Sequence, residues 1–172
     1  SYNNYNDIFS ALAISKSLPK NLGTVVIKHA NPCGVSINKN SLKSYQLALA
    51  CDPTSAFGGI VSCNYQINKN LAMELDSIFL EVVIANGFDH EALKILKKKK
   101  NLRLIDSTNF TIENSIRFNS ANESILSQSE DIKKFNIKNF KIVSKKKPTK
   151  SQMTNLIFAF NICRYVKSNA IV

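Results

Sequence analysis

A chain of 172 residues that is 44% apolar, with 5 glycines and 4 prolines, can bury the core of one folded domain, which excludes a disordered tail. No stretch approaches the roughly 20 apolar residues of a membrane-spanning helix, so we expect no membrane partner. The N-terminus lacks the basic and apolar regions of a secretory signal. Because the chain starts without Met and stops at an apolar NAIV segment, we expect it to be a piece of something longer.

The net charge of +11 is the one extreme feature of the composition. Clustered Lys and Arg neutralise nucleic-acid phosphates, so a basic nucleic-acid-binding module is one interpretation. A biased genome composition is the other, because Lys, Asn and Ile are plentiful throughout. Solvated faces explain lysine runs such as 97–100, and we expect no nucleic-acid partner. The four cysteines stand at scattered spacings, which favours reduced thiols and a cytoplasmic location over a disulfide framework.

Helical and strand patterns alternate through the first two-thirds of the chain. The first expected helix, 6–18, is capped by Asn6 or Asp7. Its apolar stripe consists of Ile8, Phe9, Leu12 and Ala13. A continuous β-branched run at 24–28 predicts a strand covered on both faces. Further helices are expected at 41–52, 68–79 and 89–100, and further strands at 58–64, 81–85 and 101–106. This alternation predicts βαβ units and a mainly parallel sheet flanked by helices.

The pattern weakens from residue 107 to residue 138, where a strand pair or a long excursion would fit. A strand is expected at 139–144. The longest helix is expected at 148–168, with Thr149 and Gln152 at the spacing of a capping box. The last four residues, 169–172, would begin another strand.

Lys28 and His29 end the first expected strand, just ahead of the segment Asn31-Pro32-Cys33-Gly34. Both side chains can serve one site only where the backbone turns, and we expect the four-residue segment 31–34 to form that turn. Ligands of open parallel sheets bind at the carboxyl ends of strands, where this pair would lie. His suits proton transfer near neutral pH, and Lys can stabilise an oxyanion. The other interpretation is a surface strand end with a chance His.

The segment HANPC, 29–33, partly matches the H-x-E…P-C-x-x-C signature of zinc deaminases. Asn31 stands where the catalytic Glu belongs, and no second Cys follows Cys33 at the required spacing. His29 and Cys33 alone are too few ligands for a tetrahedral site, so we expect no metal. Nothing in the sequence marks the Cys33 thiol as an activated nucleophile.

The segment CDPTSAFGGI, 51–60, is a second candidate site. Its Asp-Pro pair should begin a turn, Gly58 and Gly59 allow a ligand close to the backbone, and Phe57 could stack on a planar heterocycle. The other interpretation is an ordinary loop with Phe57 in the core. Glu81 opens the next strand, where it could accept hydrogen bonds from a ligand or simply face solvent. No G-x-G-x-x-G or Walker motif occurs, so nucleotide sites of those kinds are unsupported.

These segments carry a family resemblance that runs in order from SYNN to Val172. The matching stretches are IKHANPCGVS, ACDPTSAFGGIVSCN, LEVVIA, EALKILKKKKNLRLID and RYVKSNAIV. Together they closely resemble the bifunctional family of purine biosynthesis that combines AICAR transformylase with IMP cyclohydrolase. The resemblance implies a cytidine-deaminase-like fold without a metal.

The resemblance also implies a reaction, formyl transfer from 10-formyltetrahydrofolate to the 5-amino group of AICAR in IMP biosynthesis. By position, it implies that His29 accepts the proton of that amino group and that Lys28 stabilises the transition state. Phe57 and Gly58 are implied to hold the aminoimidazole carboxamide. Glu81 and Asn169 match residues that bind the nucleotide. We add Asn31 to the predicted substrate-binding residues.

Residues 1–172 are expected to form the N-terminal, incomplete part of the transformylase domain. The cyclohydrolase domain and the half with most folate contacts are expected outside them, so we predict little or no activity for the chain alone. The resemblance implies a homodimer for the complete protein. A basic nucleic-acid-binding module and a non-catalytic fragment that binds a partner chain remain the alternatives.

Overall fold

The computed structural model describes residues 1–111, 116–129 and 136–172. The chain divides into two compact units. The first comprises residues 1–110 and 159–172, and the second comprises residues 111–158. The first unit holds every predicted site residue, and each unit is described by itself.

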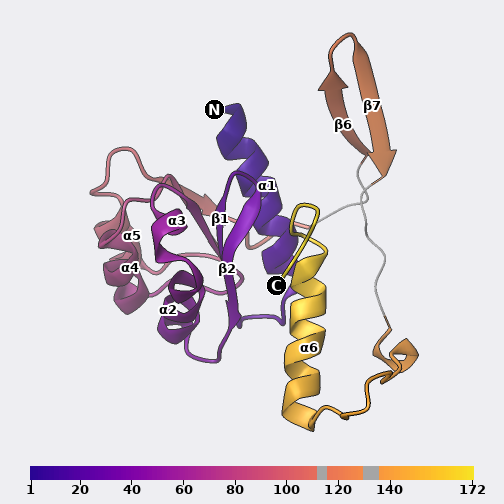
Figure 1. Cartoon of the computed structure of the whole chain (residues 1–172). Helices are drawn as coiled ribbons and strands as arrows, with labels where there is room; N and C mark the ends of the chain where they lie inside the picture. The colour runs from indigo at the N-terminus through magenta and orange to yellow at the C-terminus, as the bar shows by residue number, and fades with distance from the viewer. Residues whose placement is uncertain (112–115, 130–135) are drawn as a thin grey trace. The chain divides into compact units, whose positions relative to one another are not determined.

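A five-stranded sheet with the order β2-β1-β3-β4-β5 forms the centre of the first unit (Figure 1). The strands are β1 (Gly23–Lys28), β2 (Asn31–Ile37), β3 (Ile60–Cys63), β4 (Val82–Ala85) and β5 (Arg103–Asp106). β1 runs antiparallel to both of its neighbours, whereas β3, β4 and β5 run parallel to one another. Four strands therefore share one direction and β1 alone opposes them, which confirms the prediction of a mainly parallel sheet.

Helices cover both faces of this sheet. α1 (Tyr2–Ser17) packs against β1, β3 and β4 on one face, where Ser62 of β3 donates a hydrogen bond to Ser15. The helices of the other face are α2 (Ser41–Cys51), the short α3 (Pro53–Ala56), α4 (Lys69–Asp76) and α5 (His90–Leu96). All residues of β3 and β4 are buried, and in β1 only Lys28 is partly exposed. The prediction of a first strand covered on both faces is confirmed.

α1 starts earlier than the sequence pattern predicts. Its N-cap is Ser1, so Asn6 and Asp7 lie inside the helix and the expected cap is wrong. The apolar stripe is also shifted, because the buried apolar residues are Ala11, Leu12 and Ile14 while Phe9 is 56% exposed. The shift places the first turns of α1 at the sheet edge and its later turns over the sheet.

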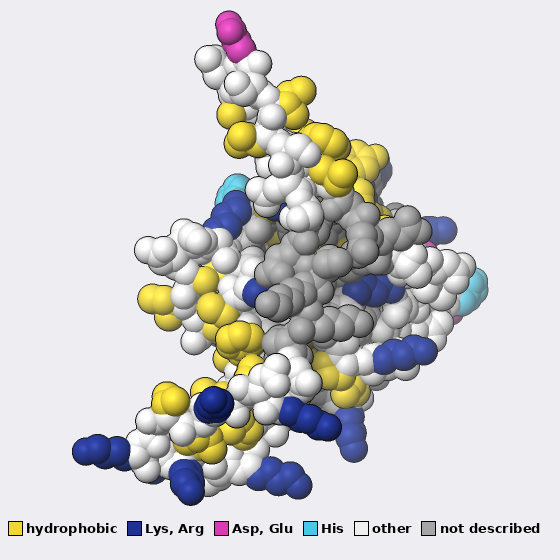
Figure 2. Space-filling model, turned by 90° about the vertical axis from the view of Figure 1, so that its right-hand side faces the viewer, with side chains coloured by type: hydrophobic (Ala, Val, Ile, Leu, Met, Phe, Trp, Pro, Cys, Tyr) yellow, Lys and Arg dark blue, Asp and Glu magenta, His cyan; other side chains and the backbone are white. Residues whose placement is uncertain are grey.

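The expected helix at 89–100 ends at Leu96, and Lys97–Lys100 form a turn before β5. Lys99 is held there, because its ammonium group donates to the carbonyl of Ile78 at 2.7 Å and lies 3.6 Å from the Asp76 carboxylate. Figure 2 shows the Lys and Arg side chains of the visible face standing apart from one another rather than forming one basic patch.

The second unit contains an antiparallel hairpin of β6 (Ile116–Ala121) and β7 (Ser124–Ser129) and a 3-10 turn, η1 (Ile137–Asn139). The hairpin confirms a strand pair in this region, although residues 112–115 and 130–135 of it lie outside the described residues. α6 (Lys150–Cys163) runs across the boundary between the units. Its capping box is confirmed, since Thr149 and Gln152 exchange hydrogen bonds of 2.9 and 3.2 Å.

The strands expected at 139–144 and at 169–172 are wrong, because Asn139 ends the 3-10 turn η1 and the other residues of these two described segments have no regular structure. An apolar β-branched segment becomes a strand only where another strand satisfies its backbone groups, and neither segment pairs with a strand of the described residues. No helix of the described residues is long and apolar enough to cross a membrane.

Candidate functional site

The turn after β1 consists of His29 and Ala30 and not of residues 31–34, so that prediction is wrong. Lys28 pairs with Asn31 across a two-residue loop, and Asn31–Ile37 form the returning strand β2. Both loop residues have positive φ, 57° for His29 and 55° for Ala30. Two-residue hairpins need such backbone angles to match the strand twist, but they usually have Asn or Gly there. A strained turn of side-chain-bearing residues is a common feature of functional sites.

Two side chains from distant parts of the chain hold this turn. The Asp7 carboxylate of α1 accepts the main-chain N–H of His29 at 3.2 Å and that of Ala30 at 2.6 Å. From the C-terminal segment, the Lys167 ammonium group donates to the carbonyl of His29 at 2.7 Å. Lys167 also donates its main-chain N–H to the side-chain oxygen of Asn31 at 3.1 Å. The N–H groups of both turn residues and the His29 carbonyl are thus bonded, while the His29 imidazole has no hydrogen bond within the described residues.

The turn lies at the amino edge of most of the sheet. Because β1 opposes the other strands, its carboxyl end meets the amino ends of β2, β3, β4 and β5. The expectation that the pair lies at the carboxyl ends of parallel strands is wrong, because Lys28 ends the one antiparallel strand, β1, and lies beside the amino ends of the parallel strands. The same edge carries Gly59 just before β3, Glu81 just before β4 and Arg103 at the start of β5.

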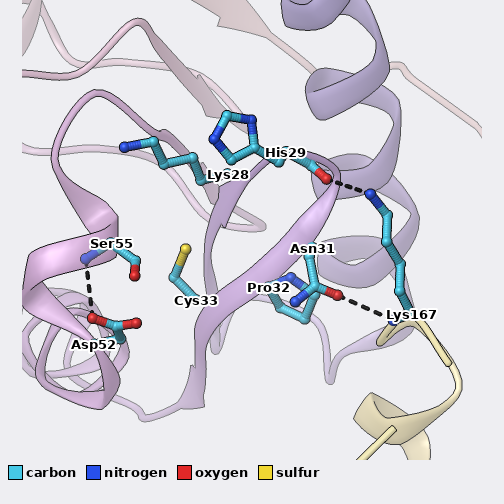
Figure 3. Close-up of a pocket in the computed structure, with 8 residues that line it drawn as sticks. All are labelled: Lys28, His29, Asn31, Pro32, Cys33, Asp52, Ser55 and Lys167. Carbon is cyan, nitrogen blue, oxygen red and sulfur yellow. Dashed lines mark hydrogen bonds between the residues drawn. The ribbon is translucent and has the colours of Figure 1, made fainter. Parts of the chain in front are cut away.

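A pocket of about 520 Å³ opens beside the turn (Figure 3). Its lining residues are Lys28, His29, Asn31, Pro32, Cys33, Asp52, Ser55 and Lys167. Figure 3 shows the His29 ring beside the Lys28 side chain, with Lys167 reaching the turn from the opposite side. The His29 imidazole, two lysine ammonium groups, the Asp52 carboxylate and the Asn31 amide therefore border one open space, which suits a polar ligand that must exchange a proton.

Cys33 and Asp52 form the floor of the pocket opposite the turn. Gly34 pairs with Val26 and Pro32 with Ile27, which leaves Cys33 as the extra residue of a β-bulge. Burial, and then the nearby Asp52 carboxylate, raise the pKa of the Cys33 thiol, so it is not an activated nucleophile. Hydrogen bonds from the Ser55 hydroxyl and main-chain N–H lower the pKa of the Asp52 carboxyl.

The expected Asp-Pro turn is a helix start instead. Asp52 caps α3, and Pro53 occupies the first turn of that helix. Phe57 follows α3 and is 59% exposed, so the interpretation of Phe57 as a core residue is wrong. Its ring packs against Phe79 with centroids 5.4 Å apart.

Lys28 connects the loop that contains Phe57 and Gly58 to the His29–Ala30 turn. Its ammonium group donates to the Phe57 carbonyl at 2.8 Å. Gly58 follows with a φ of +72° and donates its N–H to the Phe79 carbonyl at 2.9 Å. The backbone angle of Gly58 is one that glycine adopts without strain, so its position in the sequence matches a structural need.

Glu81 lies at the same sheet edge but does not line the pocket. Its main-chain N–H donates to the Gly59 carbonyl at 3.0 Å. Its carboxylate accepts from the Asn4 side chain at 3.3 Å and from Arg103 at 3.3 Å. Glu81 is thus tied to α1 and β5 and adjoins the loop that carries Gly58.

Asn169 is exposed in the C-terminal segment, two residues beyond Lys167. Its side chain has no hydrogen bond within the described residues. The structure therefore brings Lys28, His29 and Asn31 into one pocket, connects Phe57 to it through Lys28, and leaves Asn169 and Glu81 outside its lining.

Sequence reasoning missed Asp7, Lys167 and Ser55 as members of this site. Ser55 could have been found, because Asp-Pro followed by Ser is typical of a capped helix start. Asp7 and Lys167 stand 22 and 138 residues from His29 in sequence, and no local pattern links them to it. Among the described residues no group of three or more His, Cys, Asp or Glu side chains could hold a metal ion.

Comparison with known proteins identifies the family. Residues 1–172 match the sequence model of the AICARFT/IMPCHase bienzyme family, and the chain belongs to this family. Relatives named bifunctional purine biosynthesis protein PurH include those of Clostridium kluyveri, 42% identical over 172 residues, and Caulobacter vibrioides, 40% identical over 176 residues. Each alignment covers the whole chain, which spans 34% and 33% of those two proteins, about a third of their length.

Two solved structures are similar to part of this chain. Acinetobacter baumannii RibD is 14% identical, with a TM-score of 0.46 over 60% of this chain and 35% of that one. The dCMP deaminase of cyanophage S-TIM5 is 12% identical, with a TM-score of 0.44 over 59% of this chain and 96% of that one. Likeness at these scores carries no argument, so the cytidine-deaminase-like part of the fold prediction stays a prediction.

Proposed function

We propose that this chain carries the catalytic pair of an AICAR formyltransferase, which transfers the formyl group of 10-formyltetrahydrofolate to the 5-amino group of AICAR in IMP biosynthesis. One observation carries the proposal. In a member of the AICARFT/IMPCHase bienzyme family, Lys28 and His29 border one pocket, and the imidazole is left without a partner among the described residues. An imidazole nitrogen whose lone pair has no hydrogen-bond partner is available to take a proton from the substrate.

The chemistry of the reaction matches these two side chains. The AICAR amine is conjugated with its ring, so it is a poor nucleophile. Neutral His29 accepts its proton as the amine nitrogen bonds to the formyl carbon. Lys28 offsets the negative charge that grows on the formyl oxygen, and one ammonium hydrogen stays with the Phe57 carbonyl while two remain for the oxygen. The bond from the formyl carbon to folate N10 then breaks, and His29 returns the proton to the leaving nitrogen.

The proposed substrate contacts follow the edge of the sheet. Phe57 offers an exposed ring for the heterocycle, and the backbone of Gly58 lies beside it. The Asn31 amide borders the pocket, while Glu81 and Asn169 flank it from β4 and from the C-terminal segment. These roles rest on the family resemblance together with the position of each residue.

The organisation of the whole protein is part of the proposal. The 172 residues form the N-terminal part of a transformylase domain, and IMP cyclohydrolase activity belongs to a separate domain outside them. We also propose that the complete protein is a homodimer and that it is located in the cytoplasm. Four free cysteines, of which Cys51 is exposed, support a reducing compartment.

A chimaera tests the proposed function. These 172 residues replace the matching segment of the Clostridium kluyveri relative, and formyl transfer to AICAR is measured beside the unaltered relative. The expected result is formyl transfer by the chimaera and none by a version with the segment deleted. Cyclohydrolase activity serves as the internal control that the protein is intact. A chimaera that keeps cyclohydrolase activity yet transfers no formyl group overturns the proposal.

A further inference from the structure

The His29–Ala30 turn is held in a backbone conformation that neither residue favours. Both have φ near +56°, in the left-handed region where Gly, Asn and Asp are the usual residues. A turn of this kind persists only where its surroundings hold it. The groups that keep this turn in place therefore also set the position of the His29 side chain.

Asp7 meets the turn with both carboxylate oxygens. Oδ2 accepts the N–H of His29 at 3.2 Å, and Oδ1 accepts the N–H of Ala30 at 2.6 Å. Successive N–H groups that converge on one side of a turn form a concave site that favours a negative charge. Asp7 fills that site from α1, the helix that packs on β1.

The main-chain carbonyl of His29 also has a hydrogen-bond partner. This carbonyl accepts from the Lys167 ammonium group at 2.7 Å. With its N–H bonded to Asp7 as well, both peptide groups that flank the Cα atom of His29 are held by hydrogen bonds. The imidazole is the one polar part of this residue with no partner in the described part of the chain, and it borders the pocket.

We propose that Asp7 is a positioning residue for the formyl transfer, because its carboxylate locks the left-handed turn that presents the His29 imidazole to the pocket. This inference rests on the proposed function for its catalytic consequence. The structural part of the inference, that the Asp7 carboxylate holds the His29–Ala30 turn (the lock), does not depend on the proposed function. Asp7 does not touch the substrate in this account, so it acts on turnover and leaves AICAR binding almost unchanged.

The chemistry of the lock requires a carboxylate. In Asp7→Asn the side-chain oxygen can still accept one of the two N–H groups. The amide nitrogen is itself a donor and cannot accept the other. Asp7→Glu keeps both acceptors on a side chain that is one methylene longer. Ala30→Gly removes the side chain that disfavours positive φ, so the turn then needs the lock less.

The first measurement uses the 172-residue chain and does not depend on any activity. The amide proton signals of His29 and Ala30 are recorded by NMR in the unaltered chain, in Asp7→Asn and in Asp7→Glu. Asp76→Asn is the matched control, since Asp76 pairs with Lys99 away from the turn. We expect Asp7→Asn to move both turn signals upfield and Asp76→Asn to move neither. Turn signals that stay in place in Asp7→Asn overturn the lock.

The second measurement uses the chimaera. Asp7→Asn should lower kcat about 100-fold, the loss that a displacement of about 1 Å can produce, while KM for AICAR stays within about twofold. Asp7→Asn/Ala30→Gly should recover at least about tenfold of that loss, because glycine restores the turn without the lock. Asp76→Asn should leave kcat unchanged. Full kcat in Asp7→Asn, or no recovery in the double variant, overturns the positioning role.

These measurements distinguish a loss of stability from a loss of catalytic function. Thermal melts of every variant show whether the assay temperature lies below unfolding, and the double variant reports on the turn even if Asp7→Asn is less stable. If the unaltered chimaera transfers no formyl group, the proposed function fails while the NMR measurement still decides the lock. If the chimaera is active and the NMR signals do not move, the function stands and the lock fails.

Discussion

The ammonium group of Lys28 lies 2.8 Å from the main-chain carbonyl oxygen of Phe57, so the last residue of β1 is tied to the loop that precedes β3. Backbone pairing brings the strands together at this edge, and this side-chain bond holds the Lys28 ammonium group at the main chain of the residue whose ring is proposed to hold the substrate. The cation therefore lies between the proposed proton acceptor, His29, and the proposed heterocycle site at Phe57.

Replacing Lys28 by Met in the chimaera should lower kcat by about 10² to 10³, the range for removing one group that stabilises a developing oxyanion. Methionine keeps most of the side-chain length without the charge. Lys94→Met is the matched control, because Lys94 pairs with Glu91 on the exposed face of α5. Steady-state formyl transfer measures both variants. Equal turnover in Lys28→Met and Lys94→Met would remove Lys28 from the mechanism.

Two buried tyrosines of one core should respond in opposite directions to the same substitution. The Tyr65 hydroxyl donates to the Ser41 carbonyl at 3.0 Å and also bonds to Thr24. The Tyr45 hydroxyl is buried and finds no partner among the described residues. Tyr65→Phe should lower the free energy of unfolding by about 1 kcal/mol, whereas Tyr45→Phe should raise it by about 1 kcal/mol.

Chemical denaturation of the two tyrosine variants, beside the unaltered chain, measures this difference. Burial raises the pKa of both phenols, so neither ionises in the neutral range and the comparison is free of charge effects. A destabilised Tyr45→Phe would show that its hydroxyl has a partner after all.

Gly34 should tolerate no side chain. A Cβ there would lie 1.9 Å from the main-chain oxygen of Ala48 in α2, and a backbone atom of a packed helix cannot give way. Gly34→Ala should therefore destabilise the chain by about 3 kcal/mol. Gly58→Ala is the control, because its Cβ would meet Phe79 at an ordinary 3.6 Å and the main penalty is its φ of +72°, about 1 to 2 kcal/mol. An equal loss in both variants contradicts this account.

The thiol of Cys33 should react slowly with iodoacetamide at neutral pH, because burial and the Asp52 carboxylate raise its pKa. Asp52→Asn removes the negative charge that disfavours the thiolate, so the midpoint of the pH–rate curve should move down. Asparagine is also a good N-cap, so α3 is retained. Mass spectrometry of the Cys33 peptide gives the rates, with Asp76→Asn as control. A midpoint that is unchanged or higher in Asp52→Asn contradicts the assigned cause.

Much of the fold could be predicted because it depends on local patterns. The continuous apolar run of β1 indicated a strand buried on both faces, and Thr149 with Gln152 indicated the start of α6. The turn after β1 could not be predicted in this way. Asn-Pro-x-Gly is typical of turns, but Gly34 is needed where α2 packs closely on β2. Tertiary packing therefore decided the role of that glycine.

The candidate site could be predicted only in part, because local sequence patterns mark some of its residues while tertiary packing brings the others to it. Lys28, His29 and Asn31 are close in sequence and lie in one pocket. The groups that fix them come from α1 and from the C-terminal segment, so only the folded chain brings Asp7 and Lys167 to the turn. The strand direction was also beyond local patterns, since pairing with β2 and β3 shows that β1 opposes the rest of the sheet.

The most direct test of the account is the rate of formyl transfer to AICAR by the chimaera with His29→Ala, measured beside His90→Ala at saturating 10-formyltetrahydrofolate. His90 is exposed at the start of α5, outside the pocket, so it controls for the loss of a histidine. We predict a loss of about 10² to 10⁴ in kcat for His29→Ala, the usual contribution of a general base, and no loss for His90→Ala. A His29→Ala chimaera that turns over as fast as its His90→Ala counterpart would contradict the central claim.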